Sequence, residues 1–273
     1  MKKSQMKKLK VNYHLLESCN YGCKFCFARY AKSEHLSLAE MQKLIVRIAE
    51  SGFFTAINFA GGEPFLINEL PYLIAFTKSL GLGTGVITNG SLLTIEQLNK
   101  VLPYLDLIGI SFHSLNDEIK RNMGFCSKDK TPLSNERLTE IVRFVRSNSN
   151  CKIKINTVVN AFNKGETLFP FIQDNSIDRW KVLRCQSFGN NDDLLISDEE
   201  WNSFCERNKG VINTVFEDTM KDTYIMVNPM GMMLKEASNG REYEEIGSVL
   251  EGDLKELLLQ HPLHVEEYQK RYI

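Results

Sequence analysis

Apolar residues recur along the chain with two alternating periods, which predict a regular succession of strands and helices. Residues 54–59, apolar at four of six positions, have the length and composition of a buried strand, which is closed by a Gly-Gly turn. From Ser37 to Gly52, apolar residues recur three and four positions apart, as on one face of a helix. The same criteria predict further strands at 11–16, 85–88, 107–111, 152–159 and 180–183, and further helices at 69–80, 94–102, 135–147, 167–174 and 198–209.

Predicted strands separated by helices imply right-handed crossover units and therefore a parallel sheet. Six strands are too few to close an eight-stranded barrel, so we expect an α/β fold with an open, partial (β/α)6 barrel over residues 9–183. We expect residues 1–8 to be a flexible basic tail. Residues 184–273, with a strand at 223–227 and a polar tail, are expected to form a C-terminal extension packed on the barrel.

Composition and charge narrow the class of protein. The 273 residues carry a net charge of −1, which gives no reason to expect binding to nucleic acid or to a membrane surface. Five lysines lie among the first ten residues, but no apolar segment of signal-peptide or transmembrane length follows them. Of the seven cysteines, three are clustered and the others scattered, which is unlike a disulfide framework and favours a reducing, cytoplasmic location.

The clustered cysteines are Cys19, Cys23 and Cys26, spaced C-x₃-C-x₂-C directly after the first predicted strand. Soft thiolates at this spacing suit zinc or an iron–sulfur cluster. A closed structural zinc site needs a fourth ligand, and no further Cys or His lies close by in the sequence. A [4Fe–4S] cluster held by three cysteines would instead leave one iron open to a non-protein ligand, as catalysis requires.

With an aromatic residue, Phe25, before its last cysteine, this motif resembles the signature of radical S-adenosylmethionine (SAM) enzymes. The resemblance implies a [4Fe–4S] cluster on the three cysteines and SAM as cofactors, with the cofactor carrying the difficult chemistry. The Gly-Gly-Glu-Pro turn after the second strand resembles the family motif that binds the methionyl amino group. By the same resemblance, the expected SAM-binding residues are Gly61, Gly62, Glu63, Asn89, Ser111, Phe27 and Arg179.

Six short motifs, in order, narrow the resemblance to the viperin-like enzymes, including the prokaryotic ones. They lie at 11–14, 57–59, 89–91, 154–156, 179–182 and 220–224. The resemblance implies a nucleotide dehydratase that converts CTP, UTP or GTP to its 3′-deoxy-3′,4′-didehydro analogue, a terminator of viral RNA synthesis. It also implies an electron donor of the flavodoxin or ferredoxin type, and we expect a monomer.

The residues themselves agree with a polyanionic substrate. Lys154 and Lys181 lie in predicted strands whose apolar neighbours point the opposite way, so both face inward or toward the barrel mouth. A lysine there either meets an anion, as in a triphosphate clamp, or extends from the strand end to solvent. Asn12 and Asn156 are candidates to hold oxygens of the substrate or of SAM, and Tyr224 resembles the family tyrosine proposed to donate hydrogen to the substrate radical.

The sequence departs from vertebrate viperins at four of their polar positions. Ala56 and Ala60 stand where those enzymes have lysine and serine, and His113 stands where they have aspartate. Phe125 occupies the place of an arginine that they use for phosphates, for which Arg121 and Lys128 are candidate replacements.

Three other functions compete with a nucleotide dehydratase. The first is a radical SAM enzyme that acts on another small nucleotide-like substrate in cofactor biosynthesis. The second, a peptide-modifying enzyme, would need auxiliary clusters, for which Cys185 and Cys205 are too isolated. The third is an inactive zinc or iron–sulfur interaction protein.

Overall fold

The computed structural model describes residues 9–28, 34–188, 191–210, 213–220, 222–237 and 242–270. The expected basic tail at 1–8 lies outside the described residues, as does position 221 of the last viperin-like motif. Within the described part, one ten-stranded sheet has the order β10-β9-β8-β1-β2-β3-β4-β5-β6-β7. None of the helices in these ranges is both long and apolar enough to cross a membrane.

The strands and helices alternate through most of the chain. The strands are β1 (Leu9–His14), β2 (Phe54–Ala60), β3 (Gly83–Thr88), β4 (Leu107–Ser111), β5 (Lys152–Val159), β6 (Arg179–Arg184), β7 (Thr214–Glu217), β8 (Met226–Val227), β9 (Met232–Glu236) and β10 (Tyr243–Ser248). The helices are α1 (Leu38–Glu50), α2 (Leu70–Ser79), α3 (Ile95–Val101), α4 (Asp117–Asn122), α5 (Asn135–Asn148), α6 (Phe169–Asp174), α7 (Asp198–Asn208), α8 (Leu254–Gln260) and α9 (Val265–Lys270).

The predicted partial barrel is confirmed, because β1 to β6 are parallel neighbours in sequence order. Two further short strands join it in parallel, β7 beside β6 and β8 beside β1. The prediction of a polar tail after the strand at 223–227 was wrong, since β9 and β10 form an antiparallel extension there and α8 and α9 follow. Its edge strand β10 is half solvated and carries two adjacent glutamates, so its sequence lacks a clear apolar alternation.

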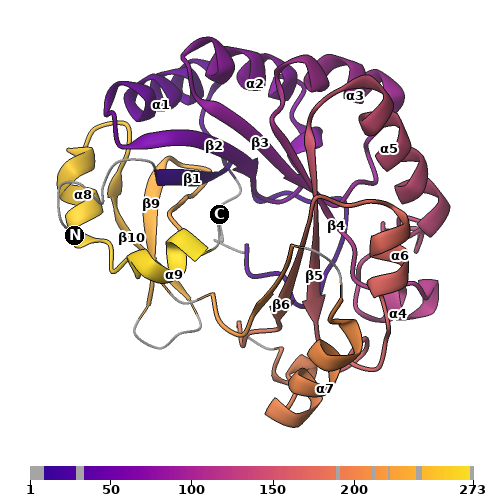
Figure 1. Ribbon diagram of the computed structural model, residues 1–273. Coiled ribbons are helices and arrows are strands. Elements are labelled where there is room, and N and C mark those ends of the chain that lie inside the picture. Colours follow the sequence, from indigo (N-terminus) through magenta and orange to yellow (C-terminus); the bar gives the residue numbers. More distant parts are fainter. Residues whose placement is uncertain are drawn as a thin grey trace.

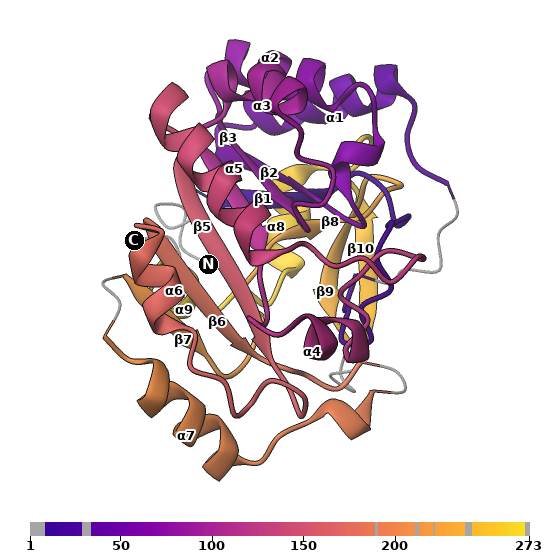
Figure 2. The same cartoon turned by 90° about the vertical axis from the view of Figure 1, so that its right-hand side faces the viewer.

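Helices cover the outer face of the curved sheet, as Figures 1 and 2 show. The outward side chains of the strands are apolar and fully buried, for example Tyr13, Phe59 and Trp180. Even the indole N–H of Trp180 is satisfied, because it donates to the hydroxyl of Thr157 at 2.9 Å. The inward side chains alternate with these along each strand, so the polar residues of the predicted motifs face the interior of the barrel.

Glycines on β3 and β4 leave room inside the barrel for long side chains from other strands. A Cβ atom at Gly109 would lie 3.0 Å from Cε of Lys154, and one at Gly85 would lie 2.3 Å from Oδ1 of Asn58. These glycines therefore allow the Lys154 and Asn58 side chains to cross the barrel interior.

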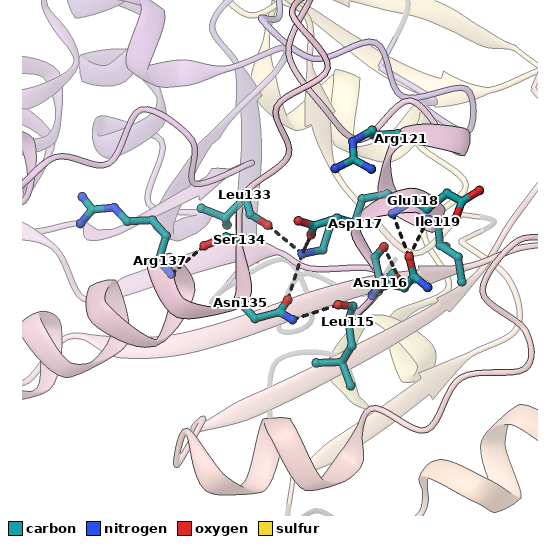
Figure 3. A network of polar contacts seen from close by, with 12 residues as sticks. Leu115, Asn116, Asp117, Glu118, Ile119, Arg121, Leu133, Ser134, Asn135 and Arg137 are labelled. Atoms are coloured by element: carbon teal, nitrogen blue, oxygen red, sulfur yellow. Dashed lines mark hydrogen bonds and ion pairs between the residues drawn. The ribbon is translucent and has the colours of Figure 1, made fainter.

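The short helix α4, which the sequence did not predict, is fixed by a completely buried lysine. The Lys120 ammonium donates to Oδ1 of Asp117 at 2.9 Å, to the Leu133 carbonyl at 2.8 Å and to Oδ1 of Asn135 at 2.9 Å. Figure 3 shows Asp117, Leu133 and Asn135 converging on this position, with the Asn135 amide also bonded to Leu115. Three acceptors compensate for burying the charge, and they fix the turn that follows α4.

Replacing Lys120 by methionine should therefore destabilise the fold strongly. Lys120→Met leaves buried acceptors without a donor, for which we expect a loss of about 2–4 kcal/mol in the free energy of unfolding. The matched control is Lys100→Met, because Lys100 pairs with Glu96 at 2.6 Å on an exposed helix surface and should contribute less than about 0.5 kcal/mol. Urea denaturation followed by circular dichroism measures both, and equal losses would contradict this account of Lys120.

Candidate functional site

The carboxyl ends of the strands surround one pocket that contains most of the predicted site residues. The cysteine motif and the Gly-Gly turn contribute its upper rim, and β1, β4, β5 and β6 its walls. Of the predicted residues it is lined by Asn12, Cys19, Cys23, Cys26, Phe27, Gly61, Gly62, Asn89, Ser111, Lys154, Asn156, Lys181 and Tyr224. This is the end of a (β/α) barrel at which active sites form.

The turn after α4 holds the cysteine loop against the barrel. The N–H of Gly22 donates to the carbonyl of Gly124 at 3.2 Å, and the N–H of Lys24 donates to that of Met123 at 3.0 Å. The buried ring of Phe125 meets the edge of Tyr21 at a centroid distance of 5.0 Å. Phe125 therefore has a packing role at the position where vertebrate viperins have a phosphate-binding arginine.

Neither of the proposed replacements for that arginine reaches the pocket. Arg121 and Lys128 are exposed, and the guanidinium of Arg121 donates to the Lys130 carbonyl at 3.2 Å. In the part of the chain that the structure describes, neither Arg121 nor Lys128 lines the pocket.

The Gly-Gly turn lies directly against the chain that leads into the cysteine motif. The N–H of Gly62 donates to the carbonyl of Leu16 at 2.7 Å. A Cβ atom at Gly62 would lie only 1.9 Å from the Ser18 carbonyl oxygen, and Gly61 has a φ of +129° that disfavours other residues. Glycine is thus required at both positions, because the turn lies so close to the backbone of residues 16–18. Both glycines also line the pocket, where a ligand can reach them.

Glu63 is fully buried beneath this turn and does not line the pocket. Its carboxylate accepts from the Thr88 hydroxyl at 2.7 Å and from the N–H groups of Asn89 at 2.8 Å and Phe65 at 3.1 Å. Burial raises the pKa of Glu63 to about 7 against these donors. The structure therefore makes it a support that joins the Gly-Gly turn to the end of β3, and not a residue that reaches a ligand directly.

Asn89 lines the pocket, but its amide mainly positions the cysteine loop. It donates to Oδ1 of Asn20 at 2.8 Å and lies 3.7 Å from the sulfur of Cys19, while its oxygen accepts from the Ser91 N–H at 2.9 Å.

His113 is a buried neutral residue at the floor of the pocket. Its Nδ1 accepts from the N–H of Val158 at 3.0 Å, which leaves the hydrogen on Nε2. The ring packs edge-on against Phe25 and Phe125 at 4.8 and 4.6 Å, and burial lowers its pKa to about 3. This packing accounts for a histidine at the family's aspartate position.

A second pocket continues the first toward the amino-terminal ends of the strands. Asn12, Lys154, Lys181 and Tyr224 line both pockets, and Lys10 and Arg179 line only the lower one. The structure thus separates Arg179, an expected SAM-binding residue, from the cysteines. The reason is that Arg179 begins β6, opposite Lys154 in the register, whereas the cysteines follow the end of β1.

The lower pocket is strongly cationic. The pKa of Lys154 is lowered to about 8, mainly by burial and also by the charges of Arg179 and Lys10, while Glu217 opposes this shift. Beside Lys154, the side-chain oxygen of Asn156 is buried and has no hydrogen-bond partner among the described residues. A buried cation next to an unsatisfied amide is typical of a site built for a polar, anionic ligand.

Lys181, the other expected clamp residue, is paired with an acid that the sequence did not reveal. Its ammonium lies 2.8 Å from Oε1 of Glu217, and both side chains are almost completely buried. The hydroxyl of Tyr224 donates to Oε2 of Glu217 at 2.9 Å, and the ammonium lies 4.3 Å from the centre of its ring. Glu217 ends the four-residue strand β7, too short for its pattern to be recognised in the sequence.

Comparison with known proteins identifies the family. The Radical SAM superfamily model matches residues 13–159. The chain is 33% identical to an S-adenosylmethionine-dependent nucleotide dehydratase of Selenomonas ruminantium, over 96% of this chain and 98% of that protein. A dehydratase of the same name from Lacinutrix mariniflava is 36% identical over 96% of this chain, which spans 57% of its length.

The chain belongs to the radical SAM superfamily, in the branch of the S-adenosylmethionine-dependent nucleotide dehydratases. A vertebrate relative in this branch is the enzyme named RSAD2 from Oncorhynchus mykiss, 31% identical over 80% of this chain and 66% of its own length. The viperin-like resemblance read from the short motifs is thereby confirmed.

Two solved structures of lower sequence identity have the same fold. SuiB of Streptococcus suis, solved bound to S-adenosylmethionine, superposes with a TM-score of 0.71 at 16% identity, over 96% of this chain and 68% of SuiB. Native anSMEcpe with bound AdoMet superposes with a TM-score of 0.71 at 11% identity, over 96% of this chain and 82% of the anSMEcpe chain.

The residues around the upper pocket suit the cofactors that radical SAM membership implies, an iron–sulfur cluster and SAM. The thiols of Cys19, Cys23 and Cys26 all line the pocket, and the first two have pKa values raised by burial and by their neighbouring thiols, as expected for closely grouped sulfurs. Among the described residues, no three Cys, His, Asp or Glu side chains converge closely enough to hold a single metal ion. Three cysteine thiols that line one pocket are the type of donor set that holds an iron–sulfur cluster.

The contact between the Gly-Gly turn and the cysteine loop yields a direct test. Gly62→Ala should displace the loop, because its Cβ atom would overlap the Ser18 carbonyl at 1.9 Å. We expect the variant to fold but to incorporate less than about half of the parent's iron and sulfide on anaerobic reconstitution. Gly22→Ala, within the cysteine motif itself, is the control, since a Cβ atom there meets nothing within 4 Å. Equal iron contents in the two variants would show that the contact does not position the cysteines.

Proposed function

We propose that this protein removes water from a nucleoside triphosphate, CTP, UTP or GTP, to give the 3′-deoxy-3′,4′-didehydro analogue. The observation that carries the proposal is the arrangement of the two pockets. Thiols and the Gly-Gly turn lie at the upper end, a group of cations lies at the lower end, and Asn12, Lys154, Lys181 and Tyr224 line both. A nucleotide can therefore reach cofactor chemistry with its sugar while its phosphates lie among cations.

At the upper end, Cys19, Cys23 and Cys26 would hold a [4Fe–4S] cluster. Together with SAM, the cluster would supply a 5′-deoxyadenosyl radical that removes the ribose 4′ hydrogen. Gly61, Gly62 and Ser111, at the end of β4, line this pocket. In our proposal the glycines would present backbone groups to SAM, and Ser111 would bind its ribose. Phe27 lies at the same rim, where its ring can contact the adenine.

At the lower end, Lys154 and Arg179 lie opposite each other on β5 and β6, and in our proposal both bind phosphates. We therefore reassign Arg179 from the cofactor to the substrate. In the described part of the chain no carboxylate is ion-paired with Lys154, whereas Lys181 is already paired with Glu217. Lys154 is accordingly the stronger phosphate ligand, and Lys181 has its main role in fixing Glu217 and Tyr224.

Between the two ends, Asn156 and Tyr224 face the position of the sugar. The unsatisfied oxygen of Asn156 can accept from a ribose hydroxyl. Loss of the 4′ hydrogen atom and of the 3′ hydroxide leaves the sugar short of one electron, and the hydroxide needs a proton to leave as water. The phenol of Tyr224 can supply both, which leaves a phenoxyl radical that the electron donor then reduces, with uptake of a proton. Glu217, which accepts the hydrogen bond of the Tyr224 hydroxyl at 2.9 Å, orients that hydroxyl.

The proposed reaction also implies a role and a location for the protein in the cell. A product without a 3′ hydroxyl would terminate viral RNA synthesis, which suggests a role in antiviral defence. The enzyme would act in the cytoplasm as a monomer, with an electron donor of the flavodoxin or ferredoxin type, and without nucleic acid or membrane as partners.

The decisive experiment incubates the reconstituted, reduced protein anaerobically with SAM and each of CTP, UTP, GTP and ATP, followed by mass spectrometry. We expect nucleotide-dependent 5′-deoxyadenosine together with a triphosphate lighter by one water, which also identifies the base. Slow formation of deoxyadenosine that ignores all four nucleotides would contradict the proposal and favour another small nucleotide-like substrate.

The low pKa of Lys154 predicts how nucleotide affinity depends on pH. Its pKa of about 8 is lowered by burial and by Arg179 and Lys10, with Glu217 opposing. Because only the protonated amine attracts phosphate, affinity should fall as the pH rises from 7.5 to 9.5, by roughly tenfold. Lys154→Arg keeps its charge throughout and should flatten this dependence, whereas Lys154→Ala should bind weakly at every pH. Titration calorimetry measures this, and a parent affinity independent of pH would refute the phosphate role of Lys154.

A further inference from the structure

Lys10 lies beside the position at which the chain departs most clearly from vertebrate viperins. In the parallel ladder of β1 and β2, the direct partner of Lys10 is Ala56, where those enzymes have lysine. Partners in neighbouring strands are about 4.8 Å apart, less than the length of a lysine side chain. A lysine at position 10 can therefore deliver its ammonium to the same part of the barrel as a lysine at position 56.

The alternation of β1 directs Lys10 into the barrel. Leu9, Val11 and Tyr13 are buried on the outer side under the helices, whereas Lys10 and Asn12 line the lower pocket. Of the two, Lys10 is nearer the start of the strand, so it lies at the deep end, away from the cysteines.

The backbone at Lys10 is held firmly. The hydroxyl of Tyr268 on α9 accepts from the N–H of Lys10 and donates to its carbonyl, the latter at 3.2 Å. Both bonds use main-chain atoms, so a different side chain at position 10 leaves them intact. Tyr268 thus fixes the position from which the lysine extends.

Lys10 adds its charge to the two cations already assigned to phosphates. Arg179 lowers the pKa of Lys10, after the larger effect of burial, and Lys10 lowers that of Lys154. Asp106, a carboxylate that also lines this pocket, is bound to the Lys78 ammonium at 2.5 Å and to the Thr84 N–H at 2.9 Å. Three cationic side chains that line one pocket form a site that suits an anion of high charge.

We propose that Lys10 binds the outermost phosphate of the nucleotide, replacing across one strand the lysine that vertebrate viperins have at the position of Ala56. The proposal rests on the proposed function and deepens it, because it explains recognition of a triphosphate over a monophosphate. The sugar lies between the two pockets, so the outermost phosphate reaches farthest toward the start of β1. Lys10 is a specificity-determining residue there, and the nucleoside end of the substrate does not contact it.

The test measures binding of CTP, UTP, GTP, ATP, the corresponding monophosphates and inorganic tripolyphosphate to the reconstituted protein by titration calorimetry. Lys10→Ala should weaken binding of the accepted triphosphate and of tripolyphosphate by about ten- to hundredfold. Its affinities for the monophosphate and for SAM should stay at parental values. The control is Lys152→Ala, since Lys152 is exposed at the same end of the sheet, pairs with Asp178 at 3.4 Å and does not line either pocket.

A double variant separates a missing charge from a damaged fold. In Lys10→Ala with Ala56→Lys, the charge returns from the neighbouring strand, and most of the lost triphosphate affinity should return with it. Parental triphosphate affinity in Lys10→Ala would overturn the proposal, and so would equal losses for monophosphate and triphosphate. If the parent binds tripolyphosphate through Lys10 but accepts none of the four nucleotides, the anion site stands and the proposed dehydratase function fails.

Discussion

Repulsion among half-buried cations is the constraint on which the rest of this site depends. Lys10, Lys154 and Arg179 face one pocket inside the barrel, where desolvation and mutual repulsion both oppose their charges. Such charges need negative charge nearby, because each cation removed from water costs several kcal/mol or more. Glu217 supplies part of it, since it pairs with Lys181 at 2.8 Å and also raises the pKa of Lys154. The lower pocket therefore favours a negatively charged ligand.

The opposite end depends on close contacts between backbones. Two turns hold the cysteine loop through main-chain hydrogen bonds. In the Gly-Gly turn, the N–H of Gly62 donates to the Leu16 carbonyl at 2.7 Å, and in the turn after α4, the carbonyl of Gly124 accepts from the Gly22 N–H at 3.2 Å. Gly124 has a φ of +76° and approaches the Gly22 carbonyl so closely that a Cβ atom would lie 2.2 Å from it. Loops that lack regular structure thus obtain a defined geometry, which a cluster bound by three side chains requires.

The fold extends to proteins of much lower sequence identity. SuiB and anSMEcpe share it with this chain at 16% and 11% identity. In this chain, Gly109 on β4 leaves room inside the barrel for the Lys154 side chain. Function therefore has to be argued from such inward-facing residues and not from the fold alone.

The sequence by itself determined the parts of the protein that depend on local order. The strands β1 to β6 and the helices between them could be predicted because their apolar periods are long and regular. The cysteine spacing and the Gly-Gly-Glu-Pro turn could be recognised because a cluster-binding loop is one short continuous segment. Even so, the sequence did not show that Glu63 would be buried beneath the turn as a support.

Only the tertiary structure decided which side chains share the barrel interior. Lys10 lies next to Ala56, and Glu217 lies between Lys181 and Tyr224, through strand registers that no local pattern encodes. The tertiary structure also moved Arg179 from the expected cofactor site to the lower pocket, because depth in a barrel depends on where each strand begins. The C-terminal strands β9 and β10 could not be predicted from the sequence, because they too depend on strand pairing. A half-solvated edge strand needs little apolar alternation when its stability comes from pairing with a neighbour.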